Sequence, residues 1–258
     1  MPVHHEPLTD ATRYIERHQH WSLEDARPQF DSYLRLVEKC RAVDADTRML
    51  EIGVGTGWFP LLCATQGLHC RGLEVSPQLV EFAHKVARDN GLPDPDIELG
   101  NVEDADLGVS EYDVIIAHSV WEHVEHWIPA TERVHRALRP DGVFVFSSTN
   151  RFAPVSAEYD FPLYGWLPDT WRYRLRVRAQ GPDIMKFGID FHQFTYPRLR
   201  REFQRIGFRR IHDRIDFARP EEIASPLKRF TVELAKKSPV FKAAALAFSD
   251  ATMFLCVK

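Results

Sequence analysis

One stretch decides the fold: Met49-Leu50-Glu51-Ile52-Gly53-Val54-Gly55-Thr56-Gly57-Trp58-Phe59. A short apolar run leads into three glycines at alternate positions, and a second apolar run follows over residues 58–62. This order predicts a buried strand, a tight loop and the start of a helix. Glycines let a loop backbone pass close to a ligand, and the first N–H groups of a helix are free to bind an anion.

Two acidic residues flank the loop and narrow the kind of ligand. Glu74 ends the next apolar run, 17 residues after Gly57, and an acid about that far on suits the two hydroxyls of a ribose. The glycine spacing is Gly-x-Gly-x-Gly rather than the Gly-x-Gly-x-x-Gly of dinucleotide folds. Glu51, at the mouth of the loop, would repel a pyrophosphate but tolerate a ligand with an ammonium and a sulfonium. The alternative is a loop that only makes a tight turn.

The loop and its acids resemble those of the class I S-adenosylmethionine-dependent methyltransferases. The first motif of that family matches Glu51, Gly53, Gly55 and Gly57, and its ribose-binding acid matches Glu74. The resemblance runs from about residue 47 to residue 150 and resumes over 191–208, about half of the chain. It implies S-adenosylmethionine as the cofactor. It also implies a doubly wound, seven-stranded, mostly parallel sheet, the Rossmann-like methyltransferase fold.

Further cofactor contacts follow from the same resemblance. Similar enzymes place a segment against the adenine after the third strand, which here is Asn101 and Val102. An amide at residue 101 replaces the family's acid but can still bind adenine N6. Val75 and His118, each at the end of a predicted strand, are expected beside the cofactor. An arginine of the N-terminal helices reaches the methionine carboxylate in similar enzymes. Arg35 is the candidate here, with a solvated surface arginine as the alternative.

The remaining patterns alternate strands with helices, which favours a parallel sheet with ligands at the carboxyl ends of the strands. The expected later strands are 69–74, 97–99, 112–117, 143–147, 211–217 and 251–257, the last as an antiparallel partner. The expected helices are 8–20, 28–42, 77–90, 129–138, 197–206 and two that start at Ser225-Pro226 and Ser238-Pro239. In the helix over 28–42, Tyr33 belongs to an apolar stripe.

Four regions follow from this pattern. They are an N-terminal helical cap (1–45), a cofactor-binding core (46–150), an acceptor-binding insert or lid (151–190), and a C-terminal completion of the sheet with basic helices (191–258). The insert lacks periodicity and is rich in aromatic residues, which argues for function rather than disorder. Within it, Arg172, Arg174, Arg176 and Arg178 would share one face of a strand but spread around a helix. The sequence does not decide between the two.

Methyl transfer needs an acceptor atom within about 3–3.5 Å of the methyl carbon. A hydroxyl acceptor must also lose a proton, and imidazole is the natural base near neutral pH. His123, with Glu122 beside it, follows the fourth strand, in a Glu-His-Val stretch that resembles sugar, phenol and quinone O-methyltransferases. His192 is the second candidate base. Each histidine has a structural role as its alternative.

No metal is expected. The similar ubiquinone-biosynthesis O-methyltransferases hold a divalent metal through a Glu-x-x-Glu-His pattern, and here Ser119 replaces the first carboxylate. Hard cations need several oxygen ligands, so the remaining pair is insufficient.

The acceptor is predicted from the insert. Its aromatic residues suit an apolar or ring-bearing molecule, and its arginines suit a phosphate or carboxylate. A small or lipid-linked acceptor would satisfy both. Nucleic acid is not expected, because the first half is strongly acidic and no nucleic-acid module is recognisable.

The net charge of −4 is unevenly distributed. Residues 1–150 carry 13 Lys and Arg against 25 Asp and Glu, whereas residues 151–258 carry 20 against 12. The basic half could face an anionic partner or simply be a solvated surface. A basic amphipathic helix after Pro226 can lie on a membrane. Covering a domain is the commoner role, and we expect that one. The cysteine spacing shows no disulfide framework, so we expect a cytoplasmic protein with reduced thiols.

Two other function classes compete with a hydroxyl-methylating enzyme. The first is a nicotinamide-dependent oxidoreductase, which shares a glycine-rich loop and a ribose-binding acid. The second is a non-catalytic protein that keeps the cofactor fold. Binding of S-adenosylhomocysteine, and methyl transfer to any acceptor, separate the three.

Overall fold

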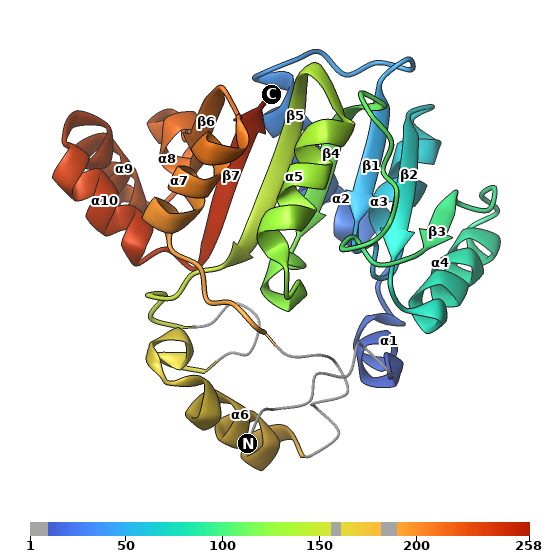
Figure 1. Cartoon of the computed structure of the whole chain (residues 1–258), viewed down its shortest axis with the longest axis horizontal. Helices are drawn as coiled ribbons and strands as arrows, with labels where there is room; N and C mark the ends of the chain where they lie inside the picture. Colours follow the sequence, from blue (N-terminus) through green and yellow to red (C-terminus); the bar gives the residue numbers. More distant parts are fainter. Residues whose placement is uncertain (1–9, 156–160, 182–189) are drawn as a thin grey trace.

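The computed structural model describes residues 10–155, 161–181 and 190–258. In these ranges a seven-stranded sheet has the order β3-β2-β1-β4-β5-β7-β6 (Figure 1). Its strands are β1 (Arg48–Ile52), β2 (His69–Glu74), β3 (Ile97–Leu99), β4 (Tyr112–His118), β5 (Leu138–Thr149), β6 (Arg210–Asp213) and β7 (Ala251–Val257). Only β7 runs antiparallel to its neighbours, β5 and β6. The expected doubly wound, mostly parallel sheet is therefore confirmed.

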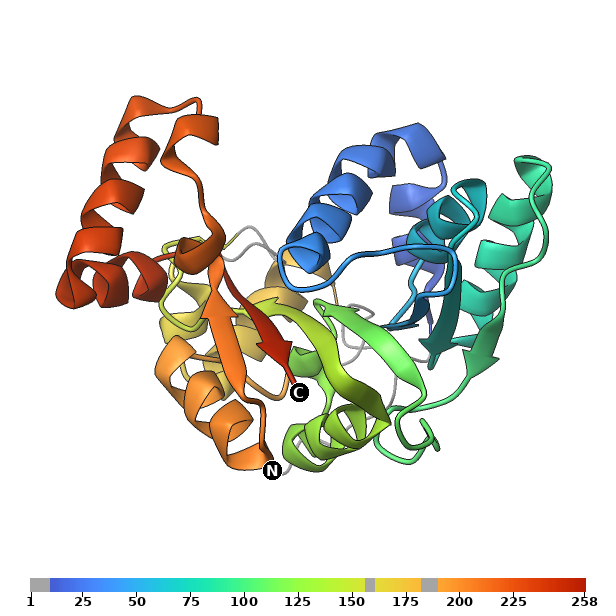
Figure 2. The ribbon, with the colours of Figure 1, turned by 90° about the horizontal axis from the view of Figure 1, so that it is seen from above.

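Helices cover both faces of the sheet (Figure 2). They are α1 (Thr12–His18), α2 (Leu23–Glu38), α3 (Trp58–Thr65), α4 (Pro77–Asp89), α5 (Trp127–Ala137), α6 (Asp169–Gln180), α7 (Tyr196–Ile206), α8 (Arg214–Phe217), α9 (Pro226–Lys237) and α10 (Pro239–Ala247). Short 3₁₀ turns are η1 (Trp121–His123), η2 (Tyr164–Trp166) and η4 (Pro220–Glu222). One core packs α2 and α3 against the sheet, and another packs α5 and α7 against its other face.

Strand β4 shows how the sequence builds both cores. Val114 and Ile116 face the α2–α3 core, whereas Ile115 and Ala117 face the α5–α7 core. Successive residues of a strand point to opposite faces, so a strand buried on both sides is a continuous apolar run. Because all strands except β7 run in the same direction, the polar residues that follow them lie at one edge of the sheet.

Helix α2 begins earlier than expected. Ser22 caps it, because its hydroxyl accepts a hydrogen bond from the Asp25 N–H while the Asp25 carboxylate accepts one from the Ser22 N–H. This reciprocal cap fixes the start of the helix at residue 23. Pro28, where the expected helix began, lies inside it.

The sixth strand is shorter than expected. β6 ends at Asp213, whose carboxylate accepts hydrogen bonds from the N–H groups of Ile215 and Asp216. An aspartate in this position starts a helix, so the segment expected to complete the strand forms α8 instead.

The arginine-rich part of the insert is helical. Arg172 and Arg176 of α6 lie one turn apart and are buried. Both donate to Asp190, which is also buried and accepts a third hydrogen bond from Gln193. The strand alternative is thereby excluded for residues 169–180. Other parts of the insert, 156–160 and 182–189, lie outside the described residues.

Candidate active site

The glycine-rich loop connects β1 to α3 at the carboxyl edge of the sheet, the edge beyond which α1 and α6 lie (Figure 1). Gly53, Gly55 and Gly57 all have positive φ, a conformation that other residues rarely adopt. At Gly53 a Cβ atom would stand 2.2 Å from a Val120 methyl carbon. The loop thus requires glycine for both conformation and space.

Glu74 closes the loop from the end of β2. One carboxylate oxygen accepts a hydrogen bond from the Gly55 N–H at 2.9 Å, and the other accepts bonds from the N–H groups of Val75 and Ser76 at 3.0 Å each. Burial raises the pKa of Glu74, against these hydrogen bonds. Glu74, the residue expected to bind the ribose, therefore lies at the loop, and three backbone N–H groups hold its carboxylate in place.

Glu51 is the unsatisfied acid of the site. It is 4% exposed, and its Oε2 has no hydrogen-bond partner among the described residues. Burial raises the pKa of Glu51 well above its ordinary value, and the neighbouring Cys70 and Glu74 raise it further. A buried carboxyl without a partner favours a bound cation or donor beside it. The residues present therefore fit a cationic cofactor such as S-adenosylmethionine.

Tyr14 of α1 covers the loop. Its hydroxyl lies 2.9 Å from the position that a Cβ atom of Gly55 would take. Burial raises the pKa of Tyr14 to about 12, and the carboxylates of Glu74 and Glu51 add to the shift. A ligand that passes close to Gly55 must therefore displace this hydroxyl, which makes α1 the part of the N-terminal cap that meets the cofactor crevice.

The adenine side of the crevice is expected at the ends of β2 and β3. Val75 is largely exposed there, and Val102 is buried in the core. Asn101 is exposed, and its side-chain oxygen accepts a hydrogen bond from the Glu103 N–H. Arg35 is also exposed. It lies two residues from the buried Tyr33 on α2, hence on the opposite side of that helix, and the structure does not bring it to the loop.

His118, at the end of β4, pairs with Tyr33. The Tyr33 hydroxyl and His118 Nδ1 are 2.5 Å apart, and the Gln29 side-chain amide lies 3.4 Å from His118 Nε2. His118 is exposed at the end of β4, and the protein packed around its ring lowers its pKa by desolvation, which favours the neutral imidazole at pH 7. If Gln29 donates to Nε2, the proton is on Nδ1, and the Nε2 lone pair becomes available to a substrate once the substrate displaces the Gln29 amide.

A cavity of about 300 Å³ adjoins this pair. It lies between α2, the ends of β4 and β5, and the start of β7. The residues that define it are Gln29, Tyr33, His118, Glu122, Ser148, Asn150, Gly165, Gln193, Arg214 and Asp250. Glu122 is buried and accepts a hydrogen bond from the Ser148 hydroxyl at 2.6 Å. Arg214, which also lines the cavity, forms an ion pair with Asp250. The cavity thus offers a base, a carboxylate and a cation to one ligand.

The two histidines expected as bases lie elsewhere. His192 Nε2 contacts the Glu125 carbonyl oxygen at 3.0 Å, and its backbone N–H donates to the Glu122 carbonyl. These contacts tie the segment before α7 to the loop after β4. His123 is half-buried in η1. Neither histidine is among the residues that line the cavity.

The pairing of Tyr33 with His118 has no signal in the sequence. Tyr33 follows a helical apolar spacing that is satisfied by packing alone, and its partner is 85 residues away. Tyr14 and Gln29 are equally inconspicuous. The one clue is that His118 lies at the end of a predicted strand, because helices that precede the first strand can cross the carboxyl edge of the sheet.

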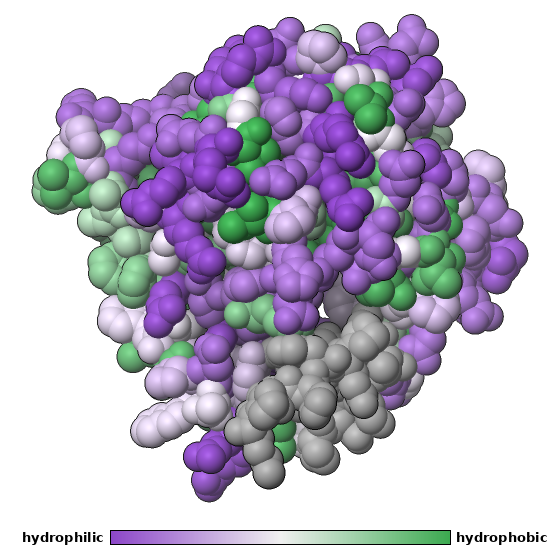
Figure 3. Space-filling view, in the orientation of Figure 1, coloured by the Kyte–Doolittle hydropathy of each residue, from purple (hydrophilic) through white to green (hydrophobic). Residues whose placement is uncertain are grey.

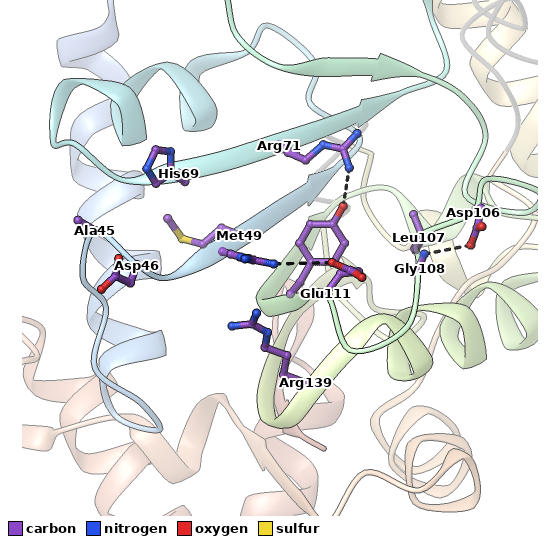
Figure 4. A pocket seen from close by; sticks show the side chains of 12 residues that line it. Ala45, Asp46, Met49, His69, Arg71, Asp106, Leu107, Gly108, Glu111 and Arg139 are labelled. Atoms are coloured by element: carbon purple, nitrogen blue, oxygen red, sulfur yellow. Dashed lines mark hydrogen bonds and ion pairs between the residues drawn. The ribbon is translucent and has the colours of Figure 1, made fainter.

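A larger hollow of about 730 Å³ lies at the opposite edge of the sheet, around the amino ends of β1, β2 and β4 (Figure 4). Its arginines are engaged: Arg71 donates to the Tyr112 hydroxyl, and Arg48 pairs with Glu111. It lies away from the glycine-rich loop, and we assign the chemistry to the smaller cavity. Among the described residues, no group of three or more His, Cys, Asp or Glu is arranged to hold a metal ion.

Comparisons with known proteins bear on this edge of the sheet. A family profile described as "Methyltransferase domain" matches residues 50–146, which run from β1 through the glycine-rich loop to β5. This part of the chain matches a methyltransferase domain, which supports the class I S-adenosylmethionine-dependent family predicted from the sequence. The cofactor of this family is S-adenosylmethionine, as the sequence predicts.

Individual relatives agree with the methyltransferase domain. A ubiquinone biosynthesis O-methyltransferase of Methylobacterium sp. is 29% identical over 130 residues, covering 48% of this chain and 51% of the relative. A probable S-adenosylmethionine-dependent methyltransferase of Mycolicibacterium smegmatis is 34% identical over 131 residues, covering 51% and 47%. The chain thus spans about half the length of the curated relatives it matches.

A solved structure extends the likeness in fold. The phosphoethanolamine N-methyltransferase 2 of Haemonchus contortus, crystallised with S-adenosylmethionine, superposes with a TM-score of 0.58 at 13% identity. The match covers 97% of this chain and 60% of that one. At this identity the methyltransferase fold is what the two share.

Proposed function

We propose that this protein transfers a methyl group from S-adenosylmethionine to a hydroxyl of a small or lipid-like acceptor bearing an anionic group. The observation that carries the proposal is the Tyr33–His118 pair beside a cavity at the carboxyl ends of β4 and β5. A neutral imidazole at this position is a base for an acceptor hydroxyl. An amine acceptor would need such a base less, since its uncharged form is already nucleophilic.

The chain's own residues would divide the work as follows. Glu74 and the loop N–H groups hold the cofactor's sugar, and Glu51 tolerates its positive charge. Tyr33 fixes the ring of His118, whose Nε2 takes the acceptor proton. The bound cofactor supplies an electrophilic methyl group. Orientation is the remaining requirement, because the acceptor oxygen must lie within about 3–3.5 Å of the methyl carbon and in line with the breaking bond.

The anionic group is assigned to the Arg214 wall of the cavity rather than to the arginines of the insert. Arg172 and Arg176 are bound to Asp190, so their charge is neutralised within α6 and its neighbours. Arg214 is partly exposed and paired with Asp250. A carboxylate or phosphate on the acceptor could share this arginine. The four cysteines are free, which supports a reducing compartment, and we propose the cytoplasm.

The assignment is tested by incubating the full-length protein and labelled S-adenosylmethionine with a cell extract and its lipid fraction. Mass spectrometry should find a product heavier by one methyl group, attached through an ether or ester oxygen. An N-methylated product would overturn the choice of acceptor atom. Tight binding of NAD without binding of S-adenosylhomocysteine would favour the oxidoreductase alternative, and methyl transfer to any component would exclude a non-catalytic protein.

The base is tested with a matched pair of variants once the acceptor is known. His118→Gln should lower kcat by about 10²–10⁴-fold and leave affinity for S-adenosylhomocysteine within a factor of about three. His123→Gln, five residues beyond the end of β4, should change kcat much less. The reverse result would assign the base to His123, as the sequence predicts, and would remove His118 from the chemistry.

A further inference from the structure

The outer face of α10 is apolar, and the charge of this helix points inward. Lys242 is its one charged residue, and it binds Asp213 and Asp216 on the side facing the domain. Val240 and Phe241 are 77% and 52% exposed, and Phe248, just past the helix, is 56% exposed. A helix that only covers a domain shows the opposite pattern, with apolar residues inside and charges outside.

The neighbouring helix α9 adds both apolar and basic side chains. Leu227 and Phe230 are 75% and 62% exposed, and Lys228, Lys236 and Lys237 are exposed on the same helix. The two helices stand apart from the sheet in Figure 2, and Figure 3 shows hydrophobic residues gathered over them at the left edge of the molecule. We call Trp166, Leu227, Phe230, Val240, Phe241 and Phe248 the apolar surface.

The apolar surface leads to the mouth of the cavity. The ring of Phe248 stacks on Trp166 with 6.5 Å between centroids, and Trp166 meets Phe152 edge to face at 5.7 Å. Gly165, beside Trp166, and Ala153, beside Phe152, line the cavity. The exposed aromatic side chains of the apolar surface therefore adjoin residues that line the cavity.

We propose that the apolar surface docks on an anionic lipid bilayer and that the acceptor enters the cavity from it. Aromatic and aliphatic side chains that project singly, flanked by lysines, suit insertion at a headgroup layer. The net positive charge of residues 151–258 complements anionic lipids. This replaces the expectation that α9 merely covers the domain. Entry of the acceptor rests on the proposed function, whereas docking does not.

Docking is tested by flotation of the full-length protein with vesicles of phosphatidylcholine alone and of phosphatidylcholine with about a third phosphatidylglycerol. The protein should float with the anionic vesicles and largely remain below the neutral ones. The variant Val240→Glu/Phe241→Glu should reduce the bound fraction by about tenfold or more, because it places charges where apolar side chains insert. Both positions are exposed, so its thermal unfolding should match that of the unaltered protein.

Control variants distinguish binding through the apolar surface from nonspecific binding to vesicles. Val109→Glu changes an exposed valine near the amino ends of the strands and should bind like the unaltered protein. Lys228→Glu/Lys237→Glu should weaken binding by about tenfold or more, since each basic residue near a charged surface contributes several-fold, whereas Arg88→Glu on α4 should not. Equal binding of Val240→Glu/Phe241→Glu, or no binding to anionic vesicles, would overturn the proposal.

A second copy of the chain is the competing occupant. Sedimentation that finds a dimer dissociated by Val240→Glu/Phe241→Glu would overturn bilayer docking in its favour. Calorimetric titration with S-adenosylhomocysteine keeps the two proposals apart. Binding to vesicles without binding of S-adenosylhomocysteine would overturn the proposed function and leave the docking proposal standing. Binding of S-adenosylhomocysteine without binding to vesicles would overturn the docking proposal and leave the proposed function standing.

Discussion

Glu51 of β1 and Glu74 of β2 flank the same glycine-rich loop but have opposite surroundings. Glu74 accepts three backbone hydrogen bonds, whereas one oxygen of Glu51 is buried with no partner among the described residues. Backbone donors hold Glu74 in place before any ligand arrives. Glu51 instead stores an unfavourable desolvation that a cationic ligand can relieve. We propose that Glu74 organises the site and that Glu51 makes it selective for positive charge.

Replacing Glu74 tests its part in this organisation. Glu74→Ala should weaken binding of S-adenosylhomocysteine by about 1–3 kcal/mol, because the ribose hydroxyls lose a charged acceptor. The melting temperature should fall as well, since three N–H groups lose theirs. Calorimetric titration and thermal unfolding measure the two effects. Glu81→Ala, on the exposed side of α4, should change neither; unaltered affinity in Glu74→Ala would exclude the ribose contact.

The raised pKa of Glu51 predicts a proton release on cofactor binding. Burial favours the protonated carboxyl in the free protein, whereas a sulfonium or ammonium beside it favours the carboxylate. The pKa must then fall on binding, so affinity for S-adenosylmethionine should increase as the pH rises toward the free protein's value and level off above it. Calorimetry in buffers of different ionisation enthalpy measures the released proton. Glu51→Gln should abolish the pH dependence, and a release that persists in this variant would assign the proton to another group.

At the level of elements, α6 is fixed by charge rather than by an apolar face. Arg172 and Arg176 both reach Asp190, a residue with no exposed surface. Gln193 donates to the same carboxylate at 2.7 Å and also lines the cavity. The network therefore connects the position of the insert to the wall of the site, and Asp190 is its common acceptor.

Removing that acceptor should release α6. Asp190→Ala leaves two buried guanidinium groups without their shared carboxylate, which should cost about 3–5 kcal/mol of unfolding free energy. Denaturant titration measures the loss, and limited proteolysis should show faster cleavage around residues 169–180. Asp169→Ala removes the exposed partner of Arg172 and should cost under about 1 kcal/mol. Equal losses in the two variants would show that burial of the network does not matter.

At the scale of the whole molecule, β7 lies between β5 and β6, so its buried side chains continue the core from one of these strands to the other. Phe254 of β7 is fully buried and packs on Tyr196 and Phe203, with ring centroids 5.0 and 5.6 Å away. Phe254→Ala should lower the free energy of unfolding by about 3–5 kcal/mol, because a large cavity would remain. Urea titration checks this, with the exposed Val109→Ala as the control near zero. A small loss of unfolding free energy would mean that α7 moves toward the sheet and fills the cavity.

The sequence predicts whatever is encoded locally. The strand–loop–helix at residues 49–62, the Ser76 cap of α4 and the two Ser-Pro starts of α9 and α10 are as expected, because each depends on a few adjacent residues. Spacing alone could not assign α6, since alternating arginines fit a strand or a helix until Asp190 is placed. The end of β6 was missed because Asp213 acts as a helix cap.

Contacts between distant segments were beyond reach. The Tyr33–His118 pair and the Tyr14 cover over Gly55 join helices before the first strand to loops at the carboxyl edge. Nothing in the local pattern of either partner marks such a contact. The edge of the sheet that holds the proposed site was therefore predictable, whereas the base proposed for it and the covering side chain required the fold.

The place of β7 has a consequence during protein synthesis. It is the last of the described strands along the chain, yet it lies between β5 and β6. β6 is therefore synthesised before β7, the strand with which it must pair, and the edge of β5 remains unpaired until β7 emerges from the ribosome. Nascent chains stalled before residue 251 should engage chaperones and resist compaction, although the entire cofactor-binding half has already emerged.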